Sequence, residues 1–340
     1  MREPSFWHRG GSWQSHLLSP AAALYGAIAG RRLVRKGFDA GIPVLCVGNY
    51  HLGGAGKTPT VLALASILRE FGERPIVLSR GYGGRRRGPL MVDPQWHSAG
   101  DVGDEPLMLA GHVPVVVACD RIEGVALAKS QAASAVLMDD GFQNPALAKD
   151  ATLIVIDGKR GIGNGQVFPA GPLRAPLSRQ LARTDALIVI GAGSAGRAIA
   201  AEVAARGKPV HSAHLEPDPS AVQKLKGKRV SAFAGIGDPD RFFKTLRASG
   251  IDVVREFPFA DHHRFSRGEI GALAVEARRE GLALVTTEKD LVRLRGAAEF
   301  AAFAREVVPF PVTLQFENLA QLKSFLSERL FKARAKRFRR

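Results

Sequence analysis

Short, unbroken apolar runs alternate along the chain with segments in which apolar residues recur at helical spacing. In the first two thirds of the chain, the runs that predict strands are Ile42 to Val47, Ile76 to Leu78, Val113 to Ala118, Ala135 to Met138, Thr152 to Ile156 and Ala186 to Ile190. Such runs are typical of strands buried on both faces, as in parallel sheets covered by helices. The pattern therefore predicts an α/β fold in which helices flank a parallel sheet.

A second unit begins after Val210. Residues 211–228 are polar and contain prolines, which suits a connector between domains. The strand pattern then resumes at Val230 to Ala234, Val253 to Phe259, Ala283 to Thr286 and Val307 to Phe316. We therefore expect an N-terminal helical region (1–36), a core domain (37–212), a linker (213–228), a second, smaller α/β domain (229–330) and a frayed basic tail (331–340).

A glycine-rich turn follows the first apolar run. It reads Gly48-Asn49-Tyr50-His51-Leu52-Gly53-Gly54-Ala55-Gly56-Lys57-Thr58-Pro59, and apolar residues at helical spacing come after it. A phosphate cradle needs backbone N–H groups that converge on an anion, and glycines allow that backbone shape. A strand, such a loop and then a helix are typical of a nucleotide triphosphate site. The core is therefore predicted to be P-loop NTPase-like and to bind ATP.

The residues predicted to bind the nucleotide are His51, Leu52, Gly53, Gly54, Ala55, Gly56, Lys57 and Thr58. Lys57 would bring a positive charge to the β and γ phosphates, and Thr58 a hydroxyl to Mg²⁺. In the strict pattern G-x-x-x-x-G-K-[ST] the first glycine falls at position 51, where this chain has His51. Because backbone groups do most of the cradling, we expect binding to survive, with His51 adding a charge-dependent contact.

The composition narrows the class of partner. A formal net charge of +16 and a pI near 10.4 imply an anionic partner, such as nucleic acid, acidic lipid or a phosphorylated substrate. The sequence has no zinc finger, RNP-like motif or basic zipper, which argues against nucleic acid. The two cysteines, Cys46 and Cys119, lack the spacing of a zinc site or disulfide framework, which favours a reducing cytosol.

The N-terminal region predicts a helix at a membrane surface. Tryptophans precede the apolar run Leu17 to Ile28, and a cationic cluster from Arg31 to Lys36 follows it. A helix of about 12 residues is about 18 Å long, too short for a hydrocarbon core of roughly 30 Å. Such flanks suit an interfacial helix on anionic lipid. Packing of the helix on its own domain is an equal alternative, and a secretory signal conflicts with ATP chemistry downstream.

Acidic residues follow a strand that is expected to neighbour the phosphate loop. Asp139 and Asp140 come directly after Ala135 to Met138. Phosphate-binding folds place carboxylates there, within reach of Mg²⁺, and both residues are expected to position the metal directly or through water. An ordinary Asp-Gly turn at Asp140-Gly141 is the alternative.

Other polar segments have both structural and functional interpretations. Gly103 to Pro106 has the pattern of a helix start, with a carboxylate and a proline in the first turn. Asp261-His262-His263 suits a proton relay better than a metal site, and a surface turn is the alternative. Thr287 and Asp290 are expected to form a capping box. Further candidates for contact with substrate or phosphate are Tyr82, Arg121, Asn164 and Arg174. A structural ion pair is nearly as plausible for Arg174.

The motifs also resemble a known family. In chain order they are Gly48-Asn49, the phosphate loop, Ser79-Arg80-Gly81-Tyr82-Gly83, Gly103-Asp104-Glu105-Pro106, Asp139-Asp140-Gly141-Phe142-Gln143, Pro169-Ala170-Gly171-Pro172-Leu173-Arg174, Asp261-His262 and Thr286-Thr287-Glu288-Lys289-Asp290. This set resembles the tetraacyldisaccharide 4'-kinases of lipid A biosynthesis in Gram-negative bacteria. The resemblance implies transfer of the ATP γ-phosphate to the 4'-hydroxyl of a tetraacyldisaccharide 1-phosphate, giving lipid IVA.

The resemblance also assigns roles and a place in the cell. It implies that Asp104 is the catalytic carboxylate and His262 its partner, so that the active site lies between the domains. It further implies that Glu105, Asp139 and Asp140 lie near Mg²⁺. A peripheral or shallowly inserted enzyme on the cytoplasmic face of the bacterial inner membrane is expected, without an obligate protein partner.

Two other functions remain open from the residues alone. One is an ATPase switch of the kind that partitions plasmids or matures metalloenzymes, although such proteins often carry a lysine where this chain has Leu52. The other is a basic membrane or nucleic-acid adaptor in which ATP is structural. ATP consumption that depends on a lipid acceptor separates the kinase from both.

Overall fold

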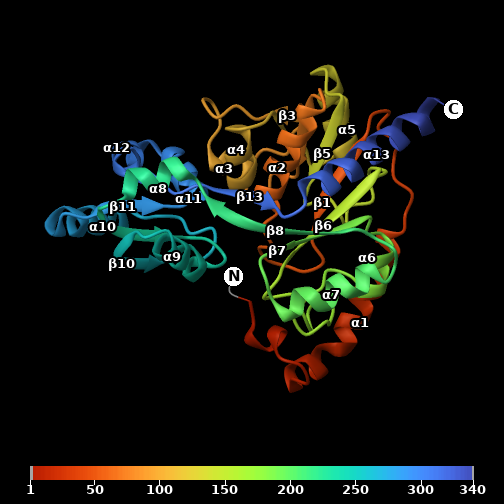
Figure 1. The fold of residues 1–340 in the computed structure, drawn as a ribbon, viewed down its shortest axis with the longest axis horizontal. Helices are drawn as coiled ribbons and strands as arrows, with labels where there is room; N and C mark the ends of the chain where they lie inside the picture. The colour runs from red at the N-terminus through yellow and green to blue at the C-terminus, as the bar shows by residue number, and fades with distance from the viewer. Residues whose placement is uncertain (1–2, 339–340) are drawn as a thin grey trace.

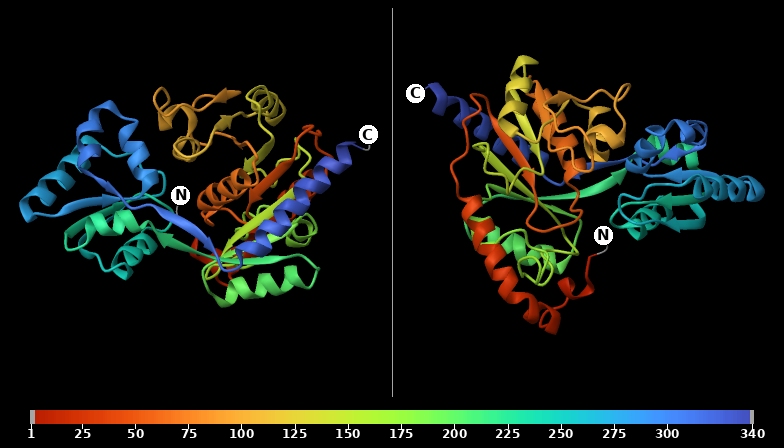
Figure 2. Two further views of the ribbon diagram at one scale, coloured as in Figure 1. Left: turned by 45° about the horizontal axis from the view of Figure 1, so that its top comes forward. Right: turned by 180° about the vertical axis from the view of Figure 1, so that it is seen from behind.

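Residues 3–338, which the computed structural model describes, form two α/β domains built on separate sheets. The larger domain lies to the right in Figure 1 and the smaller one to the left. Two long strands, β8 (Val210–Pro217) and β13 (Val312–Phe316), lead between them. Figure 2 shows the same two crossings from two further sides.

The nine-stranded sheet of the larger domain places the phosphate loop near its centre. Strand β1 (Val44–Gly48) lies between β6 (Ala151–Asp157) and β5 (Ala135–Asp139) and runs parallel to both. The order is β13-β8-β7-β6-β1-β5-β2-β4-β3, with β7 (Ala186–Ile190), β2 (Pro75–Ser79), β4 (Val115–Val117) and β3 (Leu90–Met91). Among the described strands of this sheet, the pairings at its two edges are antiparallel, β13 with β8 and β3 with β4, and the others are parallel.

Helices cover both faces of this sheet. Apolar residues of α2 (Lys57–Glu70), α4 (Asp104–Ala110) and α13 (Leu319–Phe338) pack on one face. Residues of α1 (Trp13–Leu33), α5 (Arg121–Ser130), α6 (Leu177–Ala182) and α7 (Ser194–Ala204) pack on the other. Two short helices, η1 (Ser5–His8) and α3 (Ala99–Val102), precede α1 and α4. The predicted parallel sheet flanked by helices is therefore confirmed.

The smaller domain has a four-stranded parallel sheet of its own. Its order is β10-β9-β11-β12, with bounds Asp252–Pro258, Arg229–Ala234, Ala283–Thr286 and Val308–Pro309. One core contains residues of α8 (Pro219–Leu225) and α9 (Pro239–Ala248). The other contains residues of α10 (Arg267–Glu280), α11 (Glu288–Arg295), η2 (Ala298–Phe300) and α12 (Ala301–Glu306). This domain matches the predicted second, smaller α/β unit in type.

The boundaries between the domains differ from those expected. The predicted linker over 213–228 is the end of β8 followed by helix α8. The apolar run Val307 to Phe316, expected as one strand, is divided between the sheets: β12 pairs with β11, whereas β13 pairs with β8. Prolines at 309 and 311 lack the N–H that a continuous ladder would need. The chain therefore returns to the larger domain near residue 312, well before residue 330.

The basic tail is not frayed over its described part. Residues 331–338 continue α13, while 339 and 340 lie outside the described residues. Arg334 contacts Glu73 at 2.7 Å, and Arg337 contacts Asp150 at 3.0 Å. These ion pairs and the buried Leu330 and Ala333 hold the end of the helix to the larger domain.

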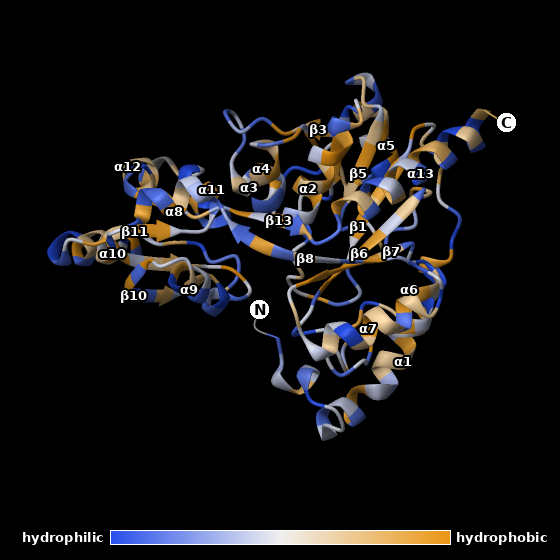
Figure 3. Cartoon of the chain, viewed as in Figure 1, coloured by the Kyte–Doolittle hydropathy of each residue, from blue (hydrophilic) through white to orange (hydrophobic). Residues whose placement is uncertain are grey.

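Helix α1 is longer than the predicted 12-residue helix and has two unlike faces. Its 21 residues place Ala22, Gly26 and Gly30 inward, where a Cβ at Gly26 would meet Pro176 at 3.5 Å. Leu17 and Leu24 point outward with 71% and 68% of their surface exposed. The helix therefore packs on its own domain, while its outer face presents large apolar side chains, and contact with a membrane stays a prediction. Figure 3 shows its mixed hydropathy. Within residues 3–338, every helix is too short or too polar to cross a bilayer.

Candidate active site

The phosphate loop has the predicted strand, loop and helix context. Strand β1 ends at Gly48 and α2 begins at Lys57. Gly56 precedes the helix with φ +85, a left-handed conformation that favours glycine, and a Cβ there would meet Ile190 Cδ1 at 2.5 Å. Lys57 and Thr58 thus occupy the first turn, where the positive end of the helix dipole lies.

Bonds from neighbouring segments fix the shape of the loop. Asn49 is fully buried and its Nδ2 donates to the Gly53 carbonyl at 3.1 Å. The backbone N–H of Leu52 donates to the Pro172 carbonyl at 2.9 Å. Arg174 donates from Nε to the His51 carbonyl at 3.1 Å. The Gly- and Pro-rich segment before Arg174 is therefore the outer support of the loop.

His51 does not provide the charge-dependent contact expected from the sequence. Its side chain is buried, and its Nδ1 lies 2.7 Å from the Leu52 carbonyl. Burial, together with the nearby charges of Lys57 and Arg174, lowers the pKa of His51 to about 4, so the ring is neutral at pH 7. Its Nε2 has no hydrogen-bond partner among the described residues. His51 is therefore a buried, uncharged residue of the loop.

Three carboxylates gather beside Lys57. Asp139 ends β5 in register with Val47 of β1, and Asp140 follows with φ +51. Burial, together with the negative charges of Glu105 and Asp140, raises the pKa of Asp139 to about 7. Burial also disfavours the charged form of Asp140, but Lys57 and Arg174 outweigh it and lower the pKa. Lys57 Nζ lies 3.7 Å and Arg174 Nη1 2.8 Å from Asp140 Oδ1.

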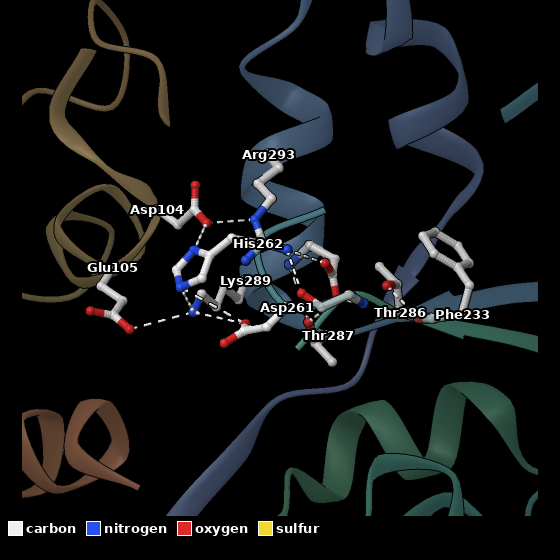
Figure 4. A network of polar contacts seen from close by, with 11 residues as sticks. Asp104, Glu105, Phe233, Asp261, His262, Thr286, Thr287, Lys289 and Arg293 are labelled. Carbon is white, nitrogen blue, oxygen red and sulfur yellow. Dashed lines mark hydrogen bonds and ion pairs between the residues drawn. The ribbon is translucent and has the colours of Figure 1, made fainter. Parts of the chain in front are cut away.

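A second cluster joins the two domains (Figure 4). His262, in the loop after β10, places Nδ1 2.9 Å from Asp104 Oδ2 at the start of α4. Arg293 of α11 donates from Nε to the same oxygen at 2.6 Å. The predicted pair of Asp104 and His262 is thus brought together from different domains, which agrees with the expected site between them.

Lys289 extends this cluster toward the carboxylates. Its Nζ lies 3.4 Å from Glu105 Oε1 and 3.3 Å from His262 Nε2. Glu105 in turn is close enough to Asp139 for its charge to raise the pKa of that residue. Lys289 therefore links Glu105 to the pair formed by His262 and Asp104.

The surroundings of Asp104 keep its carboxylate charged. Burial would raise its pKa, but the hydrogen bond from His262 and the charge of Arg293 outweigh burial and lower it. The surroundings of Asp104 therefore do not make it a stronger base, because they lower its pKa. The side chain also does not cap α4, although Gly103, Asp104, Glu105 and Pro106 do form the helix start expected from the sequence.

The four candidates for substrate or phosphate contact have different outcomes. Tyr82 is 73% exposed, and its ring lies edge-on to His262 at 6.1 Å between centroids. Arg174 holds Asp140 and the phosphate loop. Arg121 is only 2% exposed and donates to the carbonyls of Ser79 and Ala118. Arg121 therefore supports the end of β2 and does not face a substrate.

Asn164 also has a structural role. Its Nδ2 lies within hydrogen-bond distance of the Phe6 and Ala170 carbonyls and of Ser15 Oγ, and its Oδ1 accepts from the Gln166 N–H. These contacts tie the N-terminal segment to the loop before Arg174. The sequence pattern suggested a substrate contact because it gives no sign of this long-range pairing.

Two cationic residues of the site were missed as functional residues. The sequence places Lys289 only in the segment where Thr287 and Asp290 are expected to form a capping box. Thr287 does cap α11, since its Oγ1 accepts from the Asp290 N–H at 3.1 Å, but the Asp290 carboxylate accepts from Thr287 Oγ1 and so does not complete the box. Arg293 received no role. Its spacing from Lys289 on a helix, four residues apart, is the signal that would have placed both side chains on one face.

Comparison with known proteins identifies the family. A family model described as tetraacyldisaccharide-1-P 4'-kinase matches residues 14–331. A tetraacyldisaccharide 4'-kinase from Bradyrhizobium diazoefficiens is 65% identical over 340 residues and covers 100% of both chains. The chain belongs to the tetraacyldisaccharide 4'-kinase family. The resemblance carried by the motifs is therefore confirmed.

Other relatives agree with this family. A tetraacyldisaccharide 4'-kinase from Nitrobacter hamburgensis is 62% identical over 98% of this chain and 100% of its own. The crystal structure of the "apo" form of LpxK from Aquifex aeolicus in complex with ATP matches with a TM-score of 0.72. The two chains are 29% identical, and the match covers 93% of this chain and 99% of the other. The fold class expected from the sequence is thus that of the family.

Proposed function

We propose that the site formed by residues of both domains transfers the γ-phosphate of ATP to the 4'-hydroxyl of a tetraacyldisaccharide 1-phosphate, giving lipid IVA. The observation that carries this proposal is the meeting of Asp104 and His262 from different domains, 2.9 Å apart. Phosphoryl transfer depends on alignment and charge neutralisation more than on covalent help from the protein. Charged groups that meet from both domains suit that demand.

The nucleotide would bind at the phosphate loop. The N–H groups of the loop and the first turn of α2 would hold its phosphates, and Lys57 would neutralise part of their charge. Arg174 keeps Asp140 and the loop in place from the other side. The open space at Gly54, where a Cβ would meet no atom within 4 Å, leaves room for phosphate at the loop.

Mg²⁺ fits the donors that are present. No group of three or more His, Cys, Asp or Glu side chains in residues 3–338 is arranged to hold a metal ion by itself. Mg²⁺ bound with ATP needs only one or two carboxylates, because phosphates and water supply the remaining ligands. Asp139, Asp140, Glu105 and the Thr58 hydroxyl would supply the protein side. When bound, the cation would neutralise charge on the β and γ phosphates and relieve the repulsion around Asp139.

Asp104 would receive the proton of the attacking alcohol. The 4'-oxygen forms a bond to the γ-phosphorus, the bond from that phosphorus to the bridging oxygen breaks, and ADP leaves with the electron pair. The hydroxyl proton passes to Asp104, whose carboxylate is kept charged by His262 and Arg293. His262 would orient the carboxylate, and Tyr82 lies beside it at the open edge of the site.

The outer face of α1 is proposed to lie on the cytoplasmic face of the bacterial inner membrane. Exposed apolar side chains on this helix are Trp13, Leu17, Leu24 and Ile28, and Arg31 and Arg32 end it. An apolar ridge that ends in arginines suits the interface of an anionic bilayer. A peripheral position of the protein on the membrane would give the proposed site access to an acylated substrate without a helix that crosses the membrane.

The proposed reaction is tested with purified full-length protein, Mg²⁺-ATP and the tetraacyldisaccharide 1-phosphate. Mass spectrometry should detect a product that is heavier by one phosphate group, and ADP should appear only when the acceptor is present. Lys57→Met serves as the control because it retains the fold but lacks the charge on the phosphates. ADP release without acceptor, and no heavier lipid, would contradict the kinase.

A further inference from the structure

A turn at the end of β6 places a second guanidinium at the phosphate loop. Strand β6 is parallel to β1, so its carboxyl end reaches the sheet edge that carries the loop. The carboxylate of Asp157 ends this strand and accepts from the backbone N–H groups of Lys159 and Arg160 at 2.9 and 3.0 Å. The turn is therefore rigid at its base and projects Arg160 beside residues 53 and 54.

Arg160 contacts the loop at its two adjacent glycines. A Cβ built on Gly53 would lie 3.2 Å from Arg160 Nη2, and Arg160 Nη1 lies 3.5 Å from the Gly54 carbonyl. Gly53 has φ +94 and faces this guanidinium without a side chain between them. The loop has Lys57 at its helical end and Arg160 at its glycine end, so that two cations flank the predicted phosphate cradle.

Glu3 occupies the same place from the N-terminal segment. Its carboxylate forms an ion pair with Arg160 and touches Gly53. His8 Nε2 lies 3.0 Å from Glu3 Oε2, the same oxygen that pairs with Arg160. The Glu3 carboxylate therefore lies at the phosphate loop, whose expected ligand is itself an anion. It pairs with Arg160, a cation that could otherwise bind the phosphates.

We propose that Arg160 is a ligand of the nucleotide phosphates and that Glu3 competes with them for it. This inference rests on the proposed function, since it takes the loop to be the ATP site. A polyphosphate carries more charge than one carboxylate and accepts a bidentate arginine fork, so it displaces Glu3 when it binds. Glu3 thus keeps Arg160 oriented toward the loop in the empty enzyme and lowers its affinity for nucleotide.

The smaller domain also contacts this turn. Arg241, in the first turn of α9, donates from Nη1 to Asp157 Oδ2 at 2.6 Å. The carboxylate that fixes the backbone of Arg160 is therefore shared with the second domain. The turn 157–160 joins three parts of the site, namely the phosphate loop, the N-terminal segment and the smaller domain.

The test measures binding of a fluorescent ATP analogue to the full-length protein, without turnover. Arg160→Met should weaken binding by roughly tenfold or more, as expected for loss of a charge-assisted contact. Arg160→Lys should lose less because it keeps the charge. Glu3→Gln should tighten binding by about two- to fivefold, a weak effect because the phosphates outcompete the single carboxylate. The double variant should bind like Arg160→Met, because Glu3 then has nothing to compete for.

Controls separate this inference from a structural ion pair and from the proposed function. Glu202 lies on α7 and forms a surface ion pair with Arg206, and Glu202→Gln should leave binding unchanged. The matching AMP analogue should not respond to Arg160→Met, since it lacks the outer phosphates. Unchanged ATP-analogue binding in Arg160→Met, or weaker binding in Glu3→Gln, would overturn the proposal. Normal binding by Lys57→Met would instead overturn the nucleotide site itself, and with it the role of Arg160.

Discussion

The phosphate loop and the Asp104 cluster are built in opposite ways. The loop is a continuous stretch between β1 and α2, and its supports, such as Pro172 and Arg174, belong to the same domain. The pair of Asp104 and His262 joins residues 158 positions apart, and Arg293 is 189 positions from Asp104. The first region is therefore complete within the larger domain, whereas the second exists only while the domains are together.

This difference separates binding from chemistry. If the smaller domain moves away, the loop keeps its shape, because its hydrogen bonds from Asn49, Pro172 and Arg174 all lie within the larger domain. Asp104 would at the same time lose the two partners that orient it and hold its charge. We therefore expect substitutions in the cluster to change turnover and substitutions under the loop to change binding or stability.

The largest effect is expected at Asp104. Asp104→Asn keeps the size of the side chain but removes the proton acceptor, so kcat should fall by about 10²- to 10⁴-fold, the range for loss of a general base. The dissociation constant for ATP should change little, because the loop is intact. Steady-state kinetics with the lipid acceptor and a nucleotide titration measure the two quantities separately.

Asp101→Asn is the matched control for this substitution. Asp101 lies three residues before Asp104 and bonds Ser98 and Arg85 within the larger domain. Its loss should leave kcat near that of the natural protein. Turnover by Asp104→Asn that equals this control would remove Asp104 from the mechanism.

The loop region is tested through the contribution of His51 to the pH dependence of the free energy of unfolding. Burial lowers the pKa of His51 from 6.5 to about 4, so the unfolded chain binds this proton more tightly than the folded one. Stability is unaffected above pH 6.5 and falls as the pH drops from about 6.5 toward 4, by up to about 3 kcal/mol. Chemical denaturation between pH 4 and 7 should show a shallower slope in His51→Gln. Equal slopes would mean that His51 is not buried in its neutral form.

A smaller effect is expected at His262. His262→Ala removes a partner of Asp104 but leaves Arg293 and the carboxylate in place. Turnover should fall by about tenfold, less than for Asp104→Asn, because the acceptor remains and only its orientation suffers. His263→Ala is the matched control, since His263 bonds Glu269 and stacks on Phe259 within the smaller domain. A greater loss in His262→Ala than in Asp104→Asn would make His262 the base.

The smallest effect is expected at Tyr82. Its ring is exposed and lies in an edge arrangement with the His262 ring, so Tyr82→Ala should reduce kcat/KM for the lipid by about two- to fivefold, the range of one aromatic contact. Trp96→Ala changes another exposed aromatic residue of the same region and serves as the comparison. The two variants should differ in acceptor kinetics and agree in ATP affinity. Equal acceptor kinetics would place Tyr82 outside the site.

The same comparison explains what could be predicted from sequence. Gly56, Lys57 and the apolar strand before them are neighbours in the chain, so their pattern reports the loop directly. Buried strands such as β5 and β6 were equally visible, because burial on both faces leaves continuous apolar runs. These parts depend on local spacing alone.

Features that depend on distant partners could not be obtained in this way. The pairing of Asp104 with His262 came only from the family resemblance, and Arg293 from neither source. The structural roles of Asn164 and Arg121 could not be predicted, because these side chains donate to the carbonyls of Phe6 and Ser79, which are 158 and 42 positions away in the sequence. The division of Val307 to Phe316 between two sheets likewise depends on tertiary pairing.

The most direct test of an active site assembled from both domains is a double-mutant cycle between Asp104 and His262, measured on kcat with saturating ATP and lipid acceptor. If His262 acts by orienting Asp104, the variant with both Asp104→Asn and His262→Gln should be no slower than Asp104→Asn alone. If the two losses multiply in the double variant, the residues act independently, and the proposed pairing across the domains is contradicted.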